Sequence, residues 1–146
     1  CGQFECLDKK IKMKQDIFNH YVEAFADIPE IEMIKEDKNR VSTHWLSIMK
    51  LNNTKVTPND IIDALDKENI ESRPIWKPMH MQPMYRMHEC VGRAGSIRCR
   101  TNAYIAGGAE DVGADIFDRG ACLPSDNKMT EEQQERIIRV IRSCFE

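Results

Sequence analysis

The sequence lacks several features that would assign it to a class at once. No apolar run approaches the ~18–20 residues that span a bilayer, and the first residues, CGQFECLDKKIKMK, lack the unbroken apolar centre of a signal peptide. A formal net charge of -3 removes the attraction expected of a protein that binds nucleic acid or an anionic membrane. We therefore expect a cytoplasmic protein that binds neither nucleic acid nor a membrane.

Short motifs for familiar chemistries are missing as well. The 6 cysteines are scattered without a C-x-x-C pair, which favours reduced structural thiols over a zinc ribbon or a disulfide scaffold. No Walker loop, nucleophile elbow or H-E-x-x-H motif occurs. His80, His88 and Cys90 have spacings that fit no standard metal site, so no metal is expected. Without a repeat or a low-complexity tract, 146 residues indicate one domain.

Three segments carry the signals of amphipathic helices. Apolar residues recur at steps of three and four from residue 7 onward, which predicts a helix within 7–28. Thr57, followed by proline, is typical of an N-cap and predicts a second helix over 58–67. Thr130 and Gln133 have the spacing of a capping box at the start of a terminal helix.

Strand signals alternate with these helices. The residues 41–51 are rich in β-branched and aromatic side chains, and short strands are also expected at 72–76 and 121–125. A short helix is expected between Gly108 and Gly120, with Gly120 as its C-cap glycine. Short strands interleaved with amphipathic helices predict a two-layer α+β domain.

Residues 72–88, SRPIWKPMHMQPMYRMH, have neither a helical nor an alternating pattern. The three prolines remove backbone donors and favour an extended or irregular loop. If the loop is extended, His80 and Gln82 project to the same face. Both can hydrogen-bond sugar hydroxyls, carbonyls or phosphates, and Lys77 and Arg73 can meet an anion. The alternative is a surface loop whose histidine and tryptophan only pack.

A family resemblance joins these observations. The string ESRPIWKPMHMQPMY, with HWLSIMKL upstream and AEDVGADIFDRGACLPSDNKMTEEQQERIIRVI downstream, resembles the carboxy-terminal domain of the DegT/DnrJ/StrS-type sugar aminotransferases, which use pyridoxal phosphate. The resemblance covers nearly the whole chain, and W-K-P-M-H-x-Q-P is its specific part. It implies the two-layer small domain of a fold-type I aminotransferase, with a short, mostly antiparallel sheet packed by helices.

The same resemblance sets an expectation for the domain organisation. Residues 1–146 are expected to be the small domain alone, without the large domain that carries the cofactor lysine. The first residue is a cysteine rather than a methionine, which is in keeping with a piece of a longer enzyme. Pyridoxal phosphate is expected in the full-length enzyme and not on this piece, which is expected to be inactive by itself.

For the reaction, the resemblance implies transfer of an amino group, with glutamate as the expected donor, to a nucleotide-linked 4-keto-6-deoxy sugar. The setting would be bacterial surface-glycan synthesis, in a homodimer whose active site is shared between subunits. The alternative is a stand-alone sugar-binding or nucleotide-binding module without catalysis.

The resemblance also implies roles for individual residues. Trp76, Lys77, His80 and Gln82 match motif positions and are expected to orient the keto-sugar or its diphosphate, with Arg73 as an anion contact. No residue of this chain is expected to be catalytic.

Two regions depart from the family pattern. Relatives often have asparagine and a basic residue where this chain has Thr43 and His44. His44 and Trp45 are still expected to bind substrate, because the strand that they match reaches toward the cofactor cleft. The residues 90–108 are expected to form a mobile loop that influences substrate selection.

Overall fold

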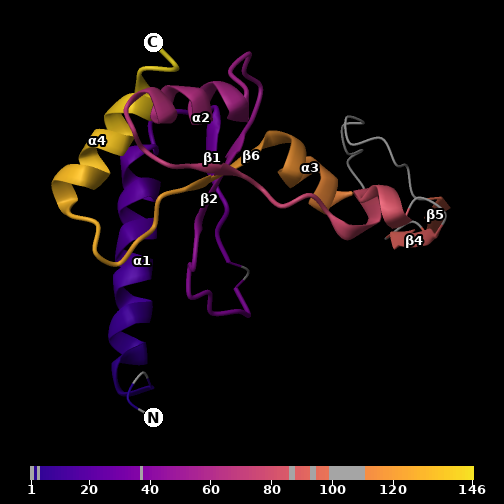
Figure 1. The fold of residues 1–146 in the computed structure, drawn as a ribbon, viewed down its shortest axis with the longest axis horizontal. Helices are drawn as coiled ribbons and strands as arrows, with labels where there is room; N and C mark the ends of the chain where they lie inside the picture. Colours follow the sequence, from indigo (N-terminus) through magenta and orange to yellow (C-terminus); the bar gives the residue numbers. More distant parts are fainter. Residues whose placement is uncertain (1, 3, 37, 86–87, 93–94, 99–110) are drawn as a thin grey trace.

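The computed structural model describes residues 2, 4–36, 38–85, 88–92, 95–98 and 111–146. A four-stranded sheet lies beside a set of helices, and a separate two-stranded hairpin lies away from them (Figure 1). In chain order the elements are η1 (Phe4–Cys6), α1 (Leu7–Ala24), β1 (Ile31–Met33), β2 (Ser47–Leu51), α2 (Pro58–Lys67), β3 (Arg73–Pro74), η2 (Met79–Met81), η3 (Pro83–Tyr85), β4 (Glu89–Gly92), β5 (Gly95–Arg98), α3 (Val112–Arg119), β6 (Gly120–Leu123) and α4 (Glu131–Arg142), where η marks a 3-10 helix.

The main sheet has the order β1-β2-β6-β3, and every neighbouring pair is antiparallel. The register pairs Met49 of β2 with Ala121 of β6, and Arg73 of β3 with Cys122 of β6. β6 therefore lies in the centre, although it is the last strand in the sequence. This arrangement confirms the expected α+β domain with a short antiparallel sheet packed by helices.

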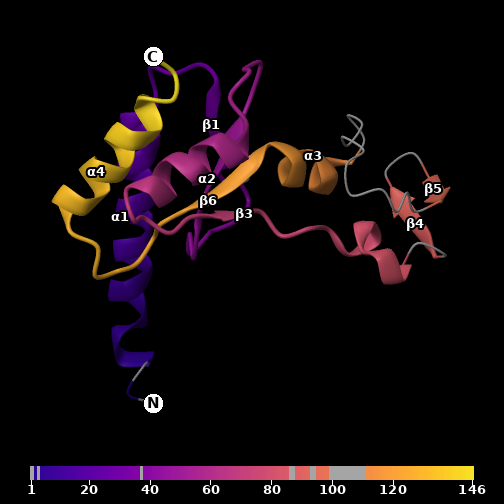
Figure 2. The ribbon, with the colours of Figure 1, turned by 45° about the horizontal axis from the view of Figure 1, so that its top comes forward.

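The core lies between one face of this sheet and the helices α1, α2 and α4 (Figure 2). Alternation along β2 buries Ser47, Met49 and Leu51 and leaves the residues between them half-buried. The fully buried large side chains include Tyr21 of α1 and Ile141 of α4. The first and last helices thus share one core with the sheet.

Helix ends follow the local signals closely. Thr57 and Asp60 form a capping box at α2, with N–H···O distances of 3.2 and 2.8 Å. Thr130 and Gln133 form the same box at α4, at 3.3 and 2.9 Å. Each box satisfies two backbone donors that a helix start otherwise leaves unpaired. The helices predicted over 58–67 and after Thr130 are therefore confirmed, and the helix predicted within 7–28 is present as Leu7–Ala24.

The strands are shorter than expected. The predicted strand over 41–51 begins only at Ser47, because His44 has a left-handed backbone with φ 45° that no continuous strand can contain. The strand expected at 72–76 pairs only over Arg73–Pro74. Ile31–Met33 forms a strand that was not predicted, since 3 residues are too few to establish an alternating pattern.

The proline-rich segment is not extended where His80 and Gln82 lie. Met81 N donates to Pro78 O and Gln82 N donates to Met79 O, both at 3.0 Å, so η2 is a tight turn and η3 follows it at once. The prediction that alternation places His80 and Gln82 on one face was therefore wrong. Pro78 precedes η2 and Pro83 begins η3, positions where a missing N–H costs no internal hydrogen bond, whereas Pro74 lies in β3.

The residues expected to form a mobile loop contain regular structure at their start. β4 and β5 pair as a hairpin, with Cys90 opposite Ile97, so the loop prediction was wrong for this part. The rest of the predicted loop, 93–94 and 99–108, lies outside the described residues. The short helix expected before Gly120 is present as α3.

Gly120 is the C-cap of α3, but its φ of -111° and ψ of 153° are those of extended backbone. A Cβ at this position would collide with the backbone oxygen of Ile116 and would lie 2.7 Å from Ile75 Cγ1. The glycine is therefore required by close packing where α3 runs directly into β6, rather than by a left-handed conformation.

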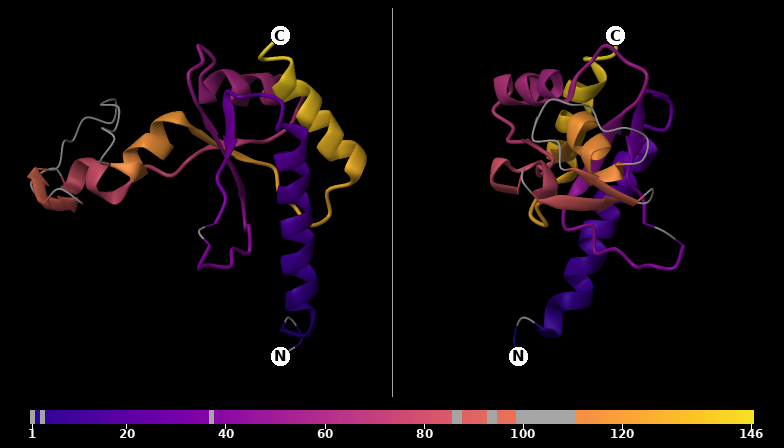
Figure 3. Two further views of the ribbon diagram at one scale, coloured as in Figure 1. Left: turned by 180° about the vertical axis from the view of Figure 1, so that it is seen from behind. Right: turned by 90° about the vertical axis from the view of Figure 1, so that its right-hand side faces the viewer.

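One part of the chain extends away from the layers. The segment after β3 and the helix α3 run outward side by side, on the side opposite α1 and α4, and the hairpin lies beyond them (Figure 3). We call the part of this extension formed by residues 75–85 and α3 the arm. Within the described ranges, none of the helices has the length and apolar composition that a membrane crossing requires.

Candidate functional site

Two indole rings meet at the base of the arm. Trp45, just before β2, and Trp76, just after β3, stack with ring centroids 5.8 Å apart and an interplanar angle of 23°. They come from opposite sides of β6, because β2 and β3 flank that strand. Their exposed fractions are 69% and 62%, so the pair presents a large apolar surface to solvent.

A cleft of about 470 Å³ borders this pair. Its lining residues come from the residue before β2, the segment around β3 and the end of β6, namely Leu46, Glu71, Ser72, Arg73, Pro74, Ile75, Trp76, Cys122, Leu123, Pro124 and Ser125. Burial raises the pKa of the Cys122 thiol, which keeps it neutral. Arg73 donates to Glu71 from Nε at 2.8 Å, so an anion in the cleft would compete with that carboxylate.

The other motif residues lie further along the arm. Gln82 Nε2 donates to the backbone oxygen of Lys77 at 3.3 Å, which closes the turn between them. The His80 side chain is 25% exposed and is not sealed in the interior. The structure thus places Trp76, Lys77, His80 and Gln82 in one short, folded stretch.

His80 has a partner that the sequence reasoning missed. Its Nε2 lies 2.7 Å from Asp111 Oδ2, although the two residues are 31 positions apart. The other carboxylate oxygen, Oδ1, accepts a hydrogen bond from Ala114 N at 2.9 Å and caps α3. An acidic residue just before a short helix was the available signal for the cap, but nothing local links it to His80.

The ionisation of Asp111 reflects these contacts. Burial disfavours the charged carboxylate, but the hydrogen bonds from Ala114 N and His80 outweigh it and lower the pKa of Asp111 below its ordinary value. The carboxylate is therefore charged at neutral pH and acts as an acceptor only.

His44 lies apart from this group. Its ring is 9% exposed and stacks on Phe18 of α1, with centroids 3.8 Å apart and an interplanar angle of 14°. Its Nε2 lies 2.8 Å from Glu36 Oε2. His44 therefore packs against the first helix, while its neighbour Trp45 faces solvent. Its contact with substrate stays a prediction.

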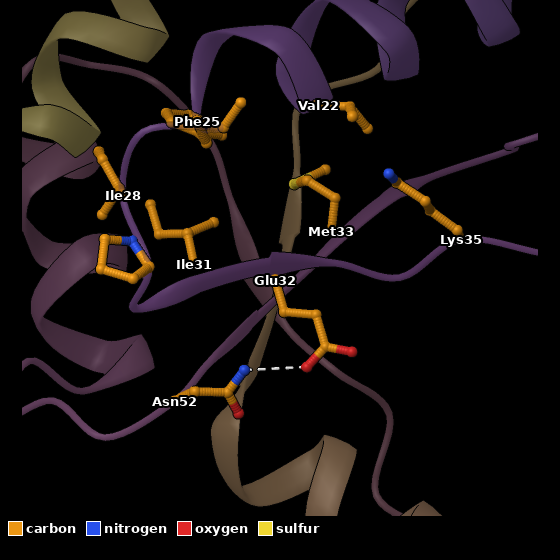
Figure 4. Close-up of a pocket in the computed structure, with 10 residues that line it drawn as sticks. Val22, Phe25, Ile28, Ile31, Glu32, Met33, Lys35 and Asn52 are labelled. Carbon is orange, nitrogen blue, oxygen red and sulfur yellow. Dashed lines mark hydrogen bonds between the residues drawn. The ribbon is translucent and has the colours of Figure 1, made fainter.

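A second hollow lies at the end of α1 (Figure 4). Val22 of α1 and Phe25, the C-cap residue of that helix, face Ile31 and Met33 of β1 across it. Glu32 and Asn52 also line the hollow; Glu32 points to the other side of β1, where it accepts a hydrogen bond from Asn52 Nδ2 at 2.9 Å. None of the residues predicted to bind substrate lines this hollow.

Cofactor chemistry needs residues that the described part of the chain does not offer. Among the described residues, no three His, Cys, Asp or Glu side chains are grouped so that they could hold a metal ion. Every lysine in these ranges is exposed or half-buried, including Lys77. A lysine that forms a Schiff base is activated by desolvation or by a neighbouring cation. No lysine in the described ranges therefore has the buried surroundings that a Schiff-base lysine needs.

Comparison with solved structures defines the class of fold. A crystal structure of a DegT DnrJ EryC1 StrS aminotransferase from Brucella abortus matches 98% of this chain with a TM-score of 0.74, at 22% sequence identity. The matched part is 33% of that chain. The α+β fold is thus one that forms part of an aminotransferase.

Comparison with sequences shows the family. The model of the DegT/DnrJ/EryC1/StrS aminotransferase family matches residues 1–142, and the chain belongs to this family. It is 34% identical over 147 residues to EpsN of Bacillus subtilis (strain 168), whose name places it among the pyridoxal phosphate-dependent aminotransferases; the match covers 99% of this chain and 34% of EpsN. It is 29% identical over 145 residues to GDP-perosamine synthase of Vibrio cholerae, covering 99% of this chain and 35% of that protein. The chain spans about a third of the length of these curated relatives.

Proposed function

We propose that residues 1–146 are the small, substrate-positioning domain of a pyridoxal phosphate-dependent aminotransferase. Its substrate is a nucleotide-linked 4-keto-6-deoxy sugar, and its product supplies bacterial surface-glycan synthesis in the cytoplasm. The observation that carries the proposal is the family match over residues 1–142. The name of the relative GDP-perosamine synthase supports a nucleotide-linked sugar as substrate.

In this proposal, the rest of the full-length protein holds the cofactor and residues 1–146 position the substrate. Pyridoxal phosphate, held by the rest of the whole protein, supplies the electron sink that transamination requires. This chain contributes position. Trp45 and Trp76 offer flat apolar faces to a sugar ring or a base, and Lys77 offers a cation to the diphosphate. Holding the keto-sugar in one orientation removes an entropic part of the barrier.

Exposed apolar side chains support a larger assembly. Trp45 and Trp76 at the base of the arm, and Met79 and Met84 further out, are all more than half exposed. The stacked indoles form a contiguous apolar surface, and such a surface marks a site that another protein segment or a ligand covers. In the proposal, this apolar surface is covered by the large domain of the full-length protein and by the second subunit of a homodimer.

The test uses the full-length protein with pyridoxal phosphate, glutamate and a panel of nucleotide-linked 4-keto-6-deoxy sugars. We expect 2-oxoglutarate to form together with an amino sugar. Mass spectrometry should show that the product differs from the keto-sugar by the replacement of the keto group with an amine. His80→Ala is expected to raise the KM for the keto-sugar up to about tenfold, the worth of one lost hydrogen bond, and to leave the cofactor absorbance unchanged. His88→Ala is the matched control, because His88 is an exposed histidine just beyond η3.

Two results would overturn the proposal. If the full-length protein aminates no member of the panel, the proposed transamination is excluded. If it binds a nucleotide sugar without turnover, a binding module without catalysis is favoured instead. Equal losses of sugar use and cofactor retention in His80→Ala would mean that His80 supports the fold rather than the substrate.

A further inference from the structure

The Asp111 carboxylate joins two parts of the arm that are distant in sequence. Oδ1 accepts from Ala114 N at 2.9 Å and so belongs to the first turn of α3. Oδ2 lies 2.7 Å from His80 Nε2 and so holds the turn η2. The exposed fractions of the two side chains are 25% and 28%, so most of the pair is shielded from water, which strengthens the contact relative to one at the open surface.

This contact decides which ring nitrogen carries the proton in neutral His80. A carboxylate can only accept, so Nε2 must donate and the neutral ring has its lone pair on Nδ1. Among the described residues, no hydrogen-bond partner of Nδ1 is present. The ring is thus held at one nitrogen and offers the other as an acceptor for a hydroxyl.

The turn that carries His80 is itself anchored. Met81 is 4% exposed and fixes the end of η2 in the interior. A Cβ at Gly113 would lie 3.5 Å from Pro78 Cγ, so the start of the turn packs against the first turn of α3. With the backbone held on both sides, the hydrogen bond from His80 to Asp111 fixes the remaining freedom of the ring.

We propose that Asp111 is a positioning residue that holds His80 in the tautomer and orientation in which Nδ1 accepts a hydrogen bond from a hydroxyl of the sugar nucleotide. This role rests on the proposed function. Asp111 itself does not touch the substrate. It acts through His80, in the way that a hydrogen-bonded carboxylate generally sets which nitrogen of an imidazole is available.

Two substitutions separate this role from helix capping. Asn and Ser are as good N-caps as Asp, so Asp111→Asn and Asp111→Ser should keep α3 and leave the unfolding temperature unchanged. In Asp111→Asn the introduced amide donates toward His80, so Nε2 must accept and the ring proton moves to Nδ1. In Asp111→Ser the ring loses its partner and rotates freely. Asp118→Asn, at an exposed site on α3, is the control for the loss of one charge.

The tautomer is read directly from 15N chemical shifts of the full-length protein labelled at histidine, in mildly alkaline buffer, with His80→Gln to assign the signals. We expect a protonated Nε2 in the wild type and in Asp118→Asn, and a protonated Nδ1 in Asp111→Asn. For the keto-sugar, we expect kcat/KM to fall about tenfold in Asp111→Asn and about threefold in Asp111→Ser, with the cofactor absorbance unchanged. The double variant His80→Gln/Asp111→Asn should be no slower than His80→Gln alone.

The outcomes that overturn the role are distinct. An unchanged tautomer in Asp111→Asn would refute the positioning contact, and so would losses that multiply in the double variant. Normal turnover by Asp111→Asn would overturn the positioning role alone. A wild-type protein that turns over no keto-sugar would overturn the proposed function, and the role of Asp111 with it.

Discussion

Arg142, in the last turn of α4, holds Asp27 with hydrogen bonds of 2.8 and 2.6 Å to its two carboxylate oxygens. The same guanidinium donates to the backbone oxygen of Ala24, the last residue of α1, at 2.7 Å. The hydrogen bonds from Arg142 lower the pKa of Asp27 from 3.8 to about 2. One side chain therefore ties together the carboxy-terminal ends of the first and last helices.

Acid should weaken this tie. Because the pKa of Asp27 is lower in the folded chain than in the unfolded chain, the contact stabilises the fold above pH 3.8 and is lost as the pH falls toward about 2. Arg142→Met should lower the unfolding temperature at neutral pH, and the difference from the wild type should narrow below pH 4. It should not vanish, since the bond to Ala24 O does not titrate. Arg139→Met, at an exposed position one turn earlier, is the control. The same difference at pH 2 and pH 7 would contradict the prediction.

Two glycines near the arm should respond oppositely to alanine. Gly120→Ala places a methyl group against the backbone oxygen of Ile116, which cannot move without distorting α3, and we expect a loss of about 1–3 kcal/mol. Gly113→Ala meets Pro78 Cγ at 3.5 Å, an ordinary contact, and gains helix propensity of about 0.5–1 kcal/mol. Urea unfolding of both variants measures the contrast. Equal effects would mean that Gly120 is not packed as described.

The hydroxyl of Tyr21 should stabilise the fold at neutral pH and cease to stabilise it at high pH. It is fully buried and donates to Pro124 O at 2.9 Å, and burial raises the pKa of Tyr21 well above 10.0. Tyr21→Phe should cost about 1 kcal/mol, because Pro124 O loses its donor. Since the folded pKa is the higher one, the stability that neutral Tyr21 gives is present below pH 10 and lost as the pH rises further. The unfolding free energies of the wild type and of Tyr21→Phe should therefore converge as the pH rises above 10. A difference that stays constant with pH would contradict the burial of the hydroxyl.

The indole pair offers a spectroscopic test of the arm's base. Stacked indoles at 5.8 Å couple their transitions, so circular dichroism should show a tryptophan exciton couplet. Trp45→Phe and Trp76→Phe should each abolish the couplet and change the unfolding free energy by about 1 kcal/mol at most, because both rings are mainly exposed. A couplet that survives in either variant would show that the rings do not stack.

The parts of the fold that were predicted are those with local causes. The capping boxes of α2 and α4 involve residues 3 positions apart, and the apolar periodicity of α1 needs no partner to be recognised. The end of the strand expected over 41–51 was different. His44 leaves the strand because its ring packs on Phe18 of α1, which lies 26 positions earlier in the chain. A window of neighbouring residues cannot contain that contact.

The candidate site shows the same limit. The residue types from Trp76 to Gln82 indicated a polar surface, and the arm does carry them together. The extended backbone considered for these residues was wrong, because prolines permit a 3-10 turn as readily as an extended segment. Asp111 was missed as a partner of His80, because only the return of the chain through α3 brings the two residues together.

The attachment of β3 to the sheet has a mechanical consequence. β3 pairs with β6 over only Arg73 and Pro74, and a proline has no N–H to give to its neighbour. Opening this short join would cost fewer backbone hydrogen bonds than separating any other strand pair of the main sheet, so we expect the arm that carries His80 to bend there first.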